Sequence, residues 1–333
     1  MQNTMNLRAV TLGLGLGLLS MGASAQTLLV ANQGDSTVSF VDAKTEAQVA
    51  VLPEETPGVH AHELATSLDG KTLYAPIYGS TGVGRPGIDG HEMLVVDIPS
   101  RKIVHHVDFG RGVRPHMPIM DPVTGMLYVT TELDKTITII DPKTLKIVGK
   151  IPTGAEQSHM FILSHDSKRA YTANVGPGSV SVLDVPGRKV ITVIPIAEHV
   201  QRISISKDDS MVFTSDTSKP QLAVIDTATN KLKTWVPLPG KGFGSASTKD
   251  GRWLMVTIPL LNQIAVIDMK TLKVARTVDV QPTPQEILVR PDGKVAYISC
   301  DKSGKVAVLD LAQWKVTKFI DVGKTDDGLA WAK

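Results

Sequence analysis

Ile264-Ala265-Val266-Ile267-Asp268 is one copy of a short phrase that occurs seven times in this chain. Each copy is a run of mostly apolar, β-branched residues closed by an aspartate, which is typical of a strand that ends in a turn. The closing aspartates are Asp42, Asp97, Asp141, Asp184, Asp226, Asp268 and Asp310, at spacings of 55, 44, 43, 42, 42 and 42 residues. A repeat of about 42 residues built from short strands predicts a β-propeller with one four-stranded blade per repeat.

The two ends of the chain each supply part of one further repeat. Residues 28–32 and the stretch that follows them have the pattern of a second, third and fourth strand, and residues 328–332 have that of a lone first strand. We expect these pieces to pair, because a closed ring leaves no open sheet edge. The predicted fold is therefore all-β, a seven-bladed β-propeller of four-stranded antiparallel blades, in one domain over residues 26–333.

The first 25 residues have the composition of a secretory signal peptide. Residues 10–21 are apolar, and Ala23-Ser24-Ala25 places small residues directly before Gln26. The apolar run is too short for a membrane span and fits a cleaved leader. We expect cleavage after Ala25, a periplasmic or secreted monomer, and no membrane span in the mature chain.

Composition excludes several classes of function. A formal net charge of +2 with 5% aromatic residues is too near neutral for a protein that binds nucleic acid through its phosphates. Cys300 is the single cysteine, so there is no internal disulfide, and the absence of Cys-x-x-Cys-His excludes covalent haem. No Gly-x-Ser-x-Gly or phosphate-binding loop occurs, so nucleophilic acyl catalysis has no support.

Superposing the repeats brings three histidines to one level. The position twelve residues before the aromatic residue or methionine of each second strand is occupied by His62, His116, His159, Gln201, Phe243, Gln285 and, in the split repeat, Asp327. First strands line the central channel of a propeller, and three converging imidazoles suit Cu²⁺ or Zn²⁺ with an open position for water or substrate. Asp327, beside His62 in the ring, is a candidate fourth ligand or a support for one. The alternative is that these histidines fill a polar channel mouth and bind ordered water.

Charged residues flank this ring on both sides. Those two positions earlier include His60, Arg114, His199 and Lys241, and those one position later include Glu63, Arg202 and Glu286. We expect them at the same mouth, where the cations would attract a small anionic ligand such as a carboxylate or a phosphate. The alternative interpretation is solvated loop charge.

One repeat carries a long Gly- and Pro-rich loop over residues 79–91, about 12 residues beyond the usual length. It joins the second and third strands of its blade, on the face where every first strand begins. Arg85, Asp89 and His91 are therefore expected near the channel mouth, because long loops on one face often carry binding residues. A flexible surface loop is the alternative.

Two stretches, Tyr128-Val129-Thr130-Thr131 and Tyr171-Thr172-Ala173-Asn174, resemble the motif of the YVTN-type β-propeller family, and Tyr297-Ile298-Ser299-Cys300 resembles it loosely. The resemblance extends over residues 26–333 and implies the same fold and an extracytoplasmic location. Such propellers are grouped with the haem domain of cytochrome d1 and with nitrous-oxide-reductase-like propellers, and the latter resemblance implies copper held by histidine at the channel.

Three functions remain open from the sequence. The first is a binding protein whose His62, His116 and His159 hold copper or zinc beside a small anionic ligand. The second is a metal-dependent hydrolase, lactonase or oxidoreductase acting on a small anionic substrate, in which Glu63 or Glu286 moves protons. The third is a scaffold that binds a protein partner at the same face, with incidental histidines.

Overall fold

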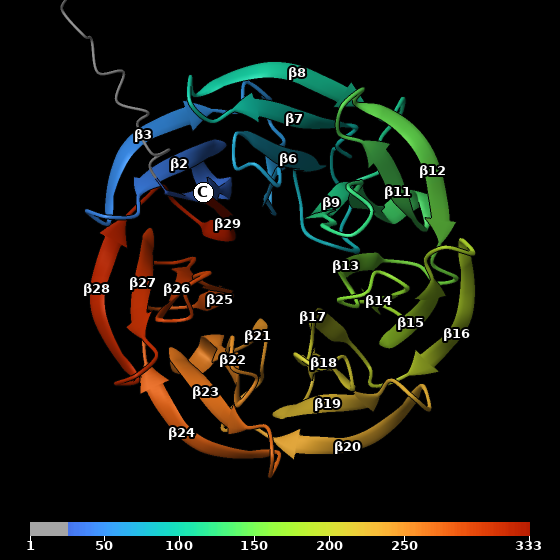
Figure 1. Ribbon diagram of the computed structural model, residues 1–333, viewed down its shortest axis with the longest axis vertical. Coiled ribbons are helices and arrows are strands. Elements are labelled where there is room, and N and C mark those ends of the chain that lie inside the picture. Colours follow the sequence, from blue (N-terminus) through green and yellow to red (C-terminus); the bar gives the residue numbers. More distant parts are fainter. Residues whose placement is uncertain (1–25) are drawn as a thin grey trace, which may run out of the picture.

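Seven β-sheets surround a central channel in the computed structural model, which describes residues 26–333 (Figure 1). The predicted signal peptide lies outside the described residues. Every pairing between neighbouring strands of a sheet is antiparallel, and no helix within residues 26–333 is long and apolar enough to cross a membrane. The predicted seven-bladed propeller is confirmed.

Each sheet runs from an inner strand at the channel to an outer strand at the rim. The first three sheets are β4 (His60–Ala61) with β5 (Ala65–Thr66), β6 (Thr72–Gly79), β7 (Glu92–Asp97) and β8 (Lys102–Asp108); β9 (Pro115–Met120), β10 (Leu127–Thr131), β11 (Thr136–Asp141) and β12 (Lys146–Pro152); and β13 (Ser158–Leu163), β14 (Arg169–Asn174), β15 (Ser179–Asp184) and β16 (Lys189–Pro195).

The next three sheets repeat this order without interruption. They are β17 (Val200–Ile205), β18 (Met211–Asp216), β19 (Gln221–Asp226) and β20 (Lys231–Pro237); β21 (Ser245–Ser247), β22 (Trp253–Ile258), β23 (Gln263–Asp268) and β24 (Lys273–Asp279); and β25 (Pro284–Val289), β26 (Val295–Cys300), β27 (Lys305–Asp310) and β28 (Lys315–Asp321). Three short 3₁₀ helices, η1 (Gln33–Asp35), η2 (Glu132–Asp134) and η3 (Pro259–Leu261), follow second strands.

The seventh sheet joins the two ends of the described chain, as predicted. Its order is β29 (Asp326–Ala332), β1 (Thr27–Asn32), β2 (Thr37–Asp42) and β3 (Ala47–Pro53), and Leu329 lies opposite Val30 across the closing pair. In Figure 1 the red strand β29 lies inside the blue strands of this blade. The ring is thus closed by backbone hydrogen bonds, which leaves no inner strand without a partner.

The core lies between blades and not within them. Buried apolar side chains form seven clusters over the described residues, and each cluster joins two neighbouring sheets. The large second-strand residue of each repeat faces the next blade, so that Tyr128 packs with Phe161 and Tyr297 packs with Leu28. Each blade therefore depends on both neighbours for burial of its sheet faces.

Five of the seven inner strands have a β-bulge at the level of the predicted ring. Pairing with the second strand skips His116 and Met117, His159, Arg202, Gln285 and Glu286, and Asp327 and Gly328. A bulge turns the extra side chain out of the regular alternation and is common next to binding sites. Here the skipped residues include four of the ring positions, which directs their side chains toward the channel.

Hydroxyl groups of the second strands hold these bulges. The Thr130 hydroxyl accepts a hydrogen bond from the Met117 N–H at 2.9 Å and donates one to the His159 carbonyl of the next blade at 2.9 Å. Thr257 does the same with Gly244 and Gln285. One side chain thereby fixes a bulge in its own blade and the height of the next inner strand.

The first inner strand is divided, which the sequence did not predict. Residues 62–64 separate β4 from β5, and there the His62 carbonyl accepts a hydrogen bond from the Gly328 N–H at 2.8 Å, not from its own second strand. In this segment the Glu63 side chain lies in the buried centre of the channel, where it forms an ion pair with Arg202. The ion pair and the contact with β29 replace the lost ladder hydrogen bonds.

Truncation of the closing strand tests the dependence on ring closure. Leu329→Ala removes a side chain that is 3% exposed in the cluster between the last two blades, and we expect it to lower the free energy of unfolding by about 2–5 kcal/mol. Leu260→Ala, at a position that is 79% exposed, is the matched control. Equal midpoints for both variants in urea denaturation would contradict a closure held by this strand.

The bulge hydroxyl gives a second test. Thr130→Val keeps the shape of the side chain but leaves the Met117 N–H and the His159 carbonyl without this partner, which should cost about 1–3 kcal/mol of unfolding free energy. Thr192→Val, on the outer strand β16, is the control because its hydroxyl makes no side-chain hydrogen bond within residues 26–333. Matching denaturation curves would show that the bulge does not need this hydroxyl.

Candidate functional site

The three predicted histidines meet in the channel. Their side chains come from the break after β4 and from the bulges of β9 and β13, and each residue is at most 8% exposed. The ring centres of His62 and His116 lie 5.3 Å apart, and those of His116 and His159 lie 3.6 Å apart. The repeat therefore brings together side chains that are separated by 54 and 43 residues in the sequence.

A tyrosine and a glutamate support this cluster from one side. The Tyr78 ring centre lies 4.7 to 5.2 Å from those of all three histidines. Glu132 accepts hydrogen bonds from the Tyr78 hydroxyl at 2.7 Å and from Nδ1 of His159 at 2.9 Å. When Nδ1 of His159 donates its proton in the hydrogen bond to Glu132, the lone pair of Nε2 is free to bind a metal.

Burial keeps two of the imidazoles neutral. Desolvation, with the neighbouring histidines and arginines adding to it, lowers the pKa of His62 and of His116 well below the usual value for histidine. Nε2 of His62 and Nδ1 of His116 are buried and have no hydrogen-bond partner within residues 26–333. A buried ring nitrogen without a partner is costly, so these atoms are suited to coordinate a metal or bind a polar ligand.

The donor atoms fit a transition metal in kind but not yet in arrangement. Among residues 26–333, no group of three or more His, Cys, Asp or Glu side chains is positioned to hold a metal ion as it stands. The near-stacked rings of His116 and His159 present faces to each other, with 32° between their planes. Rotation of one ring about its side-chain bonds is required before three nitrogens point at one centre.

A buried charge cluster occupies the channel beneath the histidines. Arg202, on the bulge of β17 with φ of 41°, forms ion pairs with Glu63 at 2.8 Å and with Asp327. The carboxyl groups of Glu63 and Glu286 lie close enough to share a hydrogen bond. Burial raises the pKa of all three carboxyl groups, that of Glu286 to about 7, because one arginine cannot compensate three ionised acids.

Asp327, which was predicted as a metal ligand, has a structural role in the channel. Its carboxylate binds Arg202 and accepts a hydrogen bond from Nε2 of Gln33 at 2.6 Å. It also lines the same cavity as the histidines. In this arrangement Asp327 orients Arg202, and any contact with a bound metal competes with that ion pair.

The long loop folds over the channel mouth. Arg114 is buried and secures it, forming an ion pair with Asp89 at 2.5 Å and donating a hydrogen bond to the Arg85 carbonyl at 2.8 Å. Gly90 lies against β6 so closely that a Cβ there would be 1.7 Å from the Ile77 carbonyl oxygen. Only glycine fits this approach, which fixes where the loop returns.

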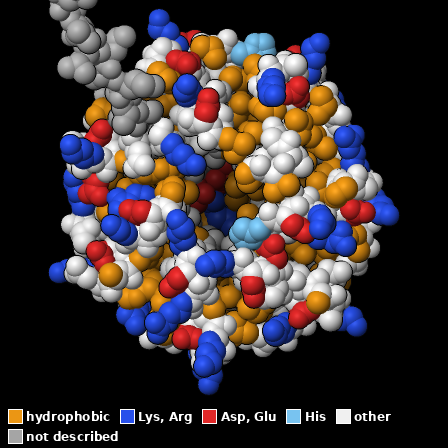
Figure 2. Space-filling model, viewed as in Figure 1, with side chains coloured by type: hydrophobic (Ala, Val, Ile, Leu, Met, Phe, Trp, Pro, Cys, Tyr) orange, Lys and Arg blue, Asp and Glu red, His pale blue; other side chains and the backbone are white. Residues whose placement is uncertain are grey.

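Loop and channel together enclose a cavity of about 320 Å³. Its lining includes the three histidines, the loop residues Gly82, Val83 and Arg85, and the acids Asp301, Asp326 and Asp327. In Figure 2 the molecule is hollowed at its centre, with acidic and basic side chains visible inside the opening. The site thus has a neutral imidazole side and an acidic side.

The predicted cationic rim is only partly present. Arg114 and Arg202 are paired with carboxylates, and His60 stacks on His62 with 5.1 Å between ring centres. His199 and Lys241 are exposed and do not line the cavity. Arg85 does line it, and its guanidinium makes no hydrogen bond or ion pair with any residue of the described chain.

Sequence reasoning overlooked Tyr78 and Glu132, although the repeat contains a signal for them. The position four residues after the large second-strand residue holds Gln33, Tyr78, Glu132 and Asp301, all of which face the channel region. Superposing this position as well as the histidine position would have shown large polar side chains in four consecutive blades, since the other three blades have Val175, Thr217 and Pro259 there. Glu63 and Glu286, in contrast, lie in the channel as expected but are engaged with Arg202 and with each other.

Comparisons with known proteins agree with this architecture. A model of the YNCE-like beta-propeller family matches residues 239–332. Kuenenia stuttgartiensis hydrazine synthase is similar in structure with a TM-score of 0.73 and 20% sequence identity, over 86% of this chain and 92% of that one. Dihydro-heme d1 dehydrogenase NirN in complex with DHE gives a TM-score of 0.66 and 16% identity, over 91% and 74% of the two chains.

No curated protein matches the sequence. At 20% and 16% identity the similarity to solved structures shows a shared fold. The resemblance to β-propeller families that was inferred from the repeat motif is thereby confirmed.

Removal of the central arginine tests the charge cluster. Arg202→Met leaves Glu63 and Asp327 buried without their counter-ion, which should lower the free energy of unfolding by about 3–5 kcal/mol. The pKa values of Glu63, Asp327 and Glu286 lie above their unfolded values, that of Glu286 at about 7 against 4.5, so the stability that these acids contribute falls as pH rises through this range. The deficit of the variant should therefore be larger at pH 8 than at pH 5 in thermal denaturation.

Arg85→Met is the matched control, since its guanidinium is exposed and unpaired among residues 26–333, and it should change stability by less than about 0.5 kcal/mol. A pH-independent deficit for Arg202→Met would show that its acidic neighbours are not the cause of the loss.

Proposed function

We propose that this chain is a periplasmic or secreted binding protein that holds a copper or zinc ion with His62, His116 and His159 in its channel cavity. The observation that carries the proposal is the convergence of three buried histidines, two of them held neutral and each with a ring nitrogen that lacks a partner. Neutral imidazole is the form that binds a metal, and the lowered pKa values of His62 and His116 make it available without a rise in pH.

The groups that contact these histidines also support a metal site. The bond from His159 to Glu132 fixes which nitrogen is protonated and increases the basicity of the other, as in carboxylate–histidine–zinc sites. Nε2 of His62 and Nδ1 of His116 have no hydrogen-bond partner within residues 26–333 that a metal would have to displace. Nitrogen donors in this number favour Cu²⁺ or Zn²⁺ over Ca²⁺ or Mg²⁺.

A small anion would complete such a site from the cavity side. The unpaired guanidinium of Arg85 lines the cavity from the loop, and carboxylates occupy the opposite wall. An anionic ligand is therefore directed to the histidine side, between a bound cation and Arg85. A cavity of about 320 Å³ accommodates a molecule of a few carbon atoms beside the metal.

Metal content and metal titration test the proposal. We expect about one copper or zinc per chain in protein purified without chelator or His-tag, and loss of at least 100-fold in Zn²⁺ affinity by calorimetry in His62→Ala/His116→Ala/His159→Ala. The matched control is His91→Ala/His105→Ala/His165→Ala, which removes three exposed histidines. Absence of metal together with no uptake of Zn²⁺ or Cu²⁺, or equal affinity of both triple variants, would overturn it.

A metal-dependent enzyme is the second candidate, because two acids near the cavity have pKa values suited to proton transfer. Burial raises the pKa of Asp326 and of Glu286 to about 7. Two structural neighbours are also named as enzymes, a hydrazine synthase and a dehydrogenase. Turnover of a lactone or other small anionic substrate by metal-loaded protein, lost in Glu286→Gln with metal binding intact, would favour this candidate.

A further inference from the structure

A second and larger cavity lies at the other end of the channel, on the face formed by the turns between first and second strands. Its volume is about 630 Å³, and its walls are mainly apolar, with Met117, Ile162, Ile203 and Ile287 among the lining residues. Arg202 and Met160 line both cavities and therefore lie between them. None of the three channel histidines lines this second cavity.

The cavity exists because one inner strand carries small side chains. Strand β21 has three residues, Ser245, Ala246 and Ser247, and Gly244 stands where the neighbouring blades have Arg202 and Glu286. A Cβ at position 244 would come within 2.2 Å of the Gln285 carbonyl oxygen, so a larger residue does not fit there. The short strand and its small residues leave space between the residues of β17 and β25 that line the cavity.

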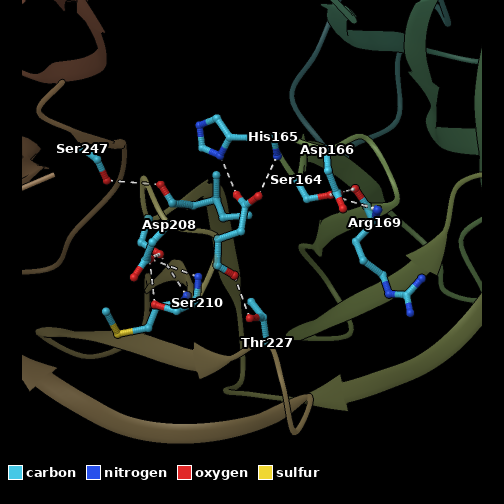
Figure 3. Close-up of polar contacts among 12 residues, drawn as sticks. Ser164, His165, Asp166, Arg169, Asp208, Ser210, Thr227 and Ser247 are labelled. Atoms are coloured by element: carbon cyan, nitrogen blue, oxygen red, sulfur yellow. Dashed lines mark hydrogen bonds and ion pairs between the residues drawn. The ribbon is translucent and has the colours of Figure 1, made fainter. Parts of the chain in front are cut away.

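Basic residues from three consecutive turns rim this cavity. His165, Lys207 and Lys249 occupy the same position of the repeat at intervals of 42 residues, and all three line the cavity. His165 is anchored by Asp209, which accepts hydrogen bonds from its backbone N–H at 2.9 Å and from its ring at 2.5 Å (Figure 3). Lys207 makes no side-chain hydrogen bond or ion pair within residues 26–333, and Lys249 donates only to the Pro291 carbonyl.

The acidic residues of the same turns lie outside the lining of the cavity. Asp208 and Asp250 accept hydrogen bonds inside their own turns, from Ser206 at 2.7 Å and Thr248 at 2.6 Å, and Asp209 binds His165. None of these three acids lines the cavity. Glu286, at the inner end of the cavity, accepts a hydrogen bond from the Leu329 N–H and lies in the Arg202 cluster. Lys207 and Lys249 are therefore the cations that line the mouth, and the interior is mainly apolar.

We infer that this cavity is a second binding site, for a small amphipathic anion with an aliphatic body and one carboxylate. The aliphatic part would lie against Met117, Ile203 and Ile287, and the carboxylate would remain at the mouth with Lys207 and Lys249. The volume is in the usual range for small-molecule sites, which are mostly apolar with a few polar groups that fix orientation. Burial of the chain supplies affinity, and the two ammonium groups select the anion over its neutral analogue.

Calorimetric titration with octanoate and with octanol tests the site. Octanoate should bind the wild-type protein at least tenfold more tightly than octanol. Ser245→Phe, or Ser204→Leu if that variant does not fold, should abolish binding of both, because each fills the space beside the hydroxyl pair that these serines form at 2.6 Å. Lys207→Glu/Lys249→Glu should weaken octanoate binding at least tenfold and leave octanol unchanged.

Lys273→Glu/Lys315→Glu, at exposed sites on outer strands, makes the same change in net charge and should bind octanoate like the wild type. The His62→Ala/His116→Ala/His159→Ala variant should also bind it normally, which separates this site from the metal site. No octanoate binding, binding unaffected by the filling variants, or equal weakening by both lysine pairs would overturn the inference.

Discussion

The hydrogen bonds of the second-strand hydroxyls hold the inner strands of this propeller in register with each other. The Thr130 hydroxyl joins the bulge of β9 to the carbonyl of His159 on the next blade, and Thr257 joins β21 to Gln285 in the same way. Because these bonds cross between blades, the height of one ring residue depends on its neighbour. The polar ring at the channel is a consequence of this shared geometry.

The channel is organised by the shortage of positive charge at its centre. Arg202 is the single buried arginine facing three carboxyl groups, Glu63, Glu286 and Asp327, and burial raises the pKa of each. These carboxyl groups therefore hold a proton to higher pH than free acids do, because burial disfavours a second uncompensated charge. The same cluster divides the channel into a histidine-lined cavity and an apolar one, so that each end offers a different chemistry.

Part of the site followed from the repeat alone. The position of His62, His116 and His159 at one level, and the location of the long loop over the mouth, were predicted from spacing, because equivalent residues of a closed ring must lie at equivalent places. Arg114 and Arg202 were also placed near the mouth, but as free cations. Spacing cannot show that Asp89 and Asp327 neutralise them, since Asp89 comes from a non-repeating loop and Asp327 from a blade on the other side of the channel.

The sequence by itself determined the number of blades, their strand order and the closure of the ring by its two ends, because a fixed period of apolar strands has few ways to bury both faces of every sheet. Only the tertiary structure decided which polar side chains pair and which imidazoles stay neutral. It also decided that the small residues of β21 leave a second cavity. These outcomes depend on contacts between blades and on burial, and both quantities are set by side chains that lie far apart in the chain. The pairing of Tyr78 and His159 through Glu132 is the clearest case, since its three members come from three blades.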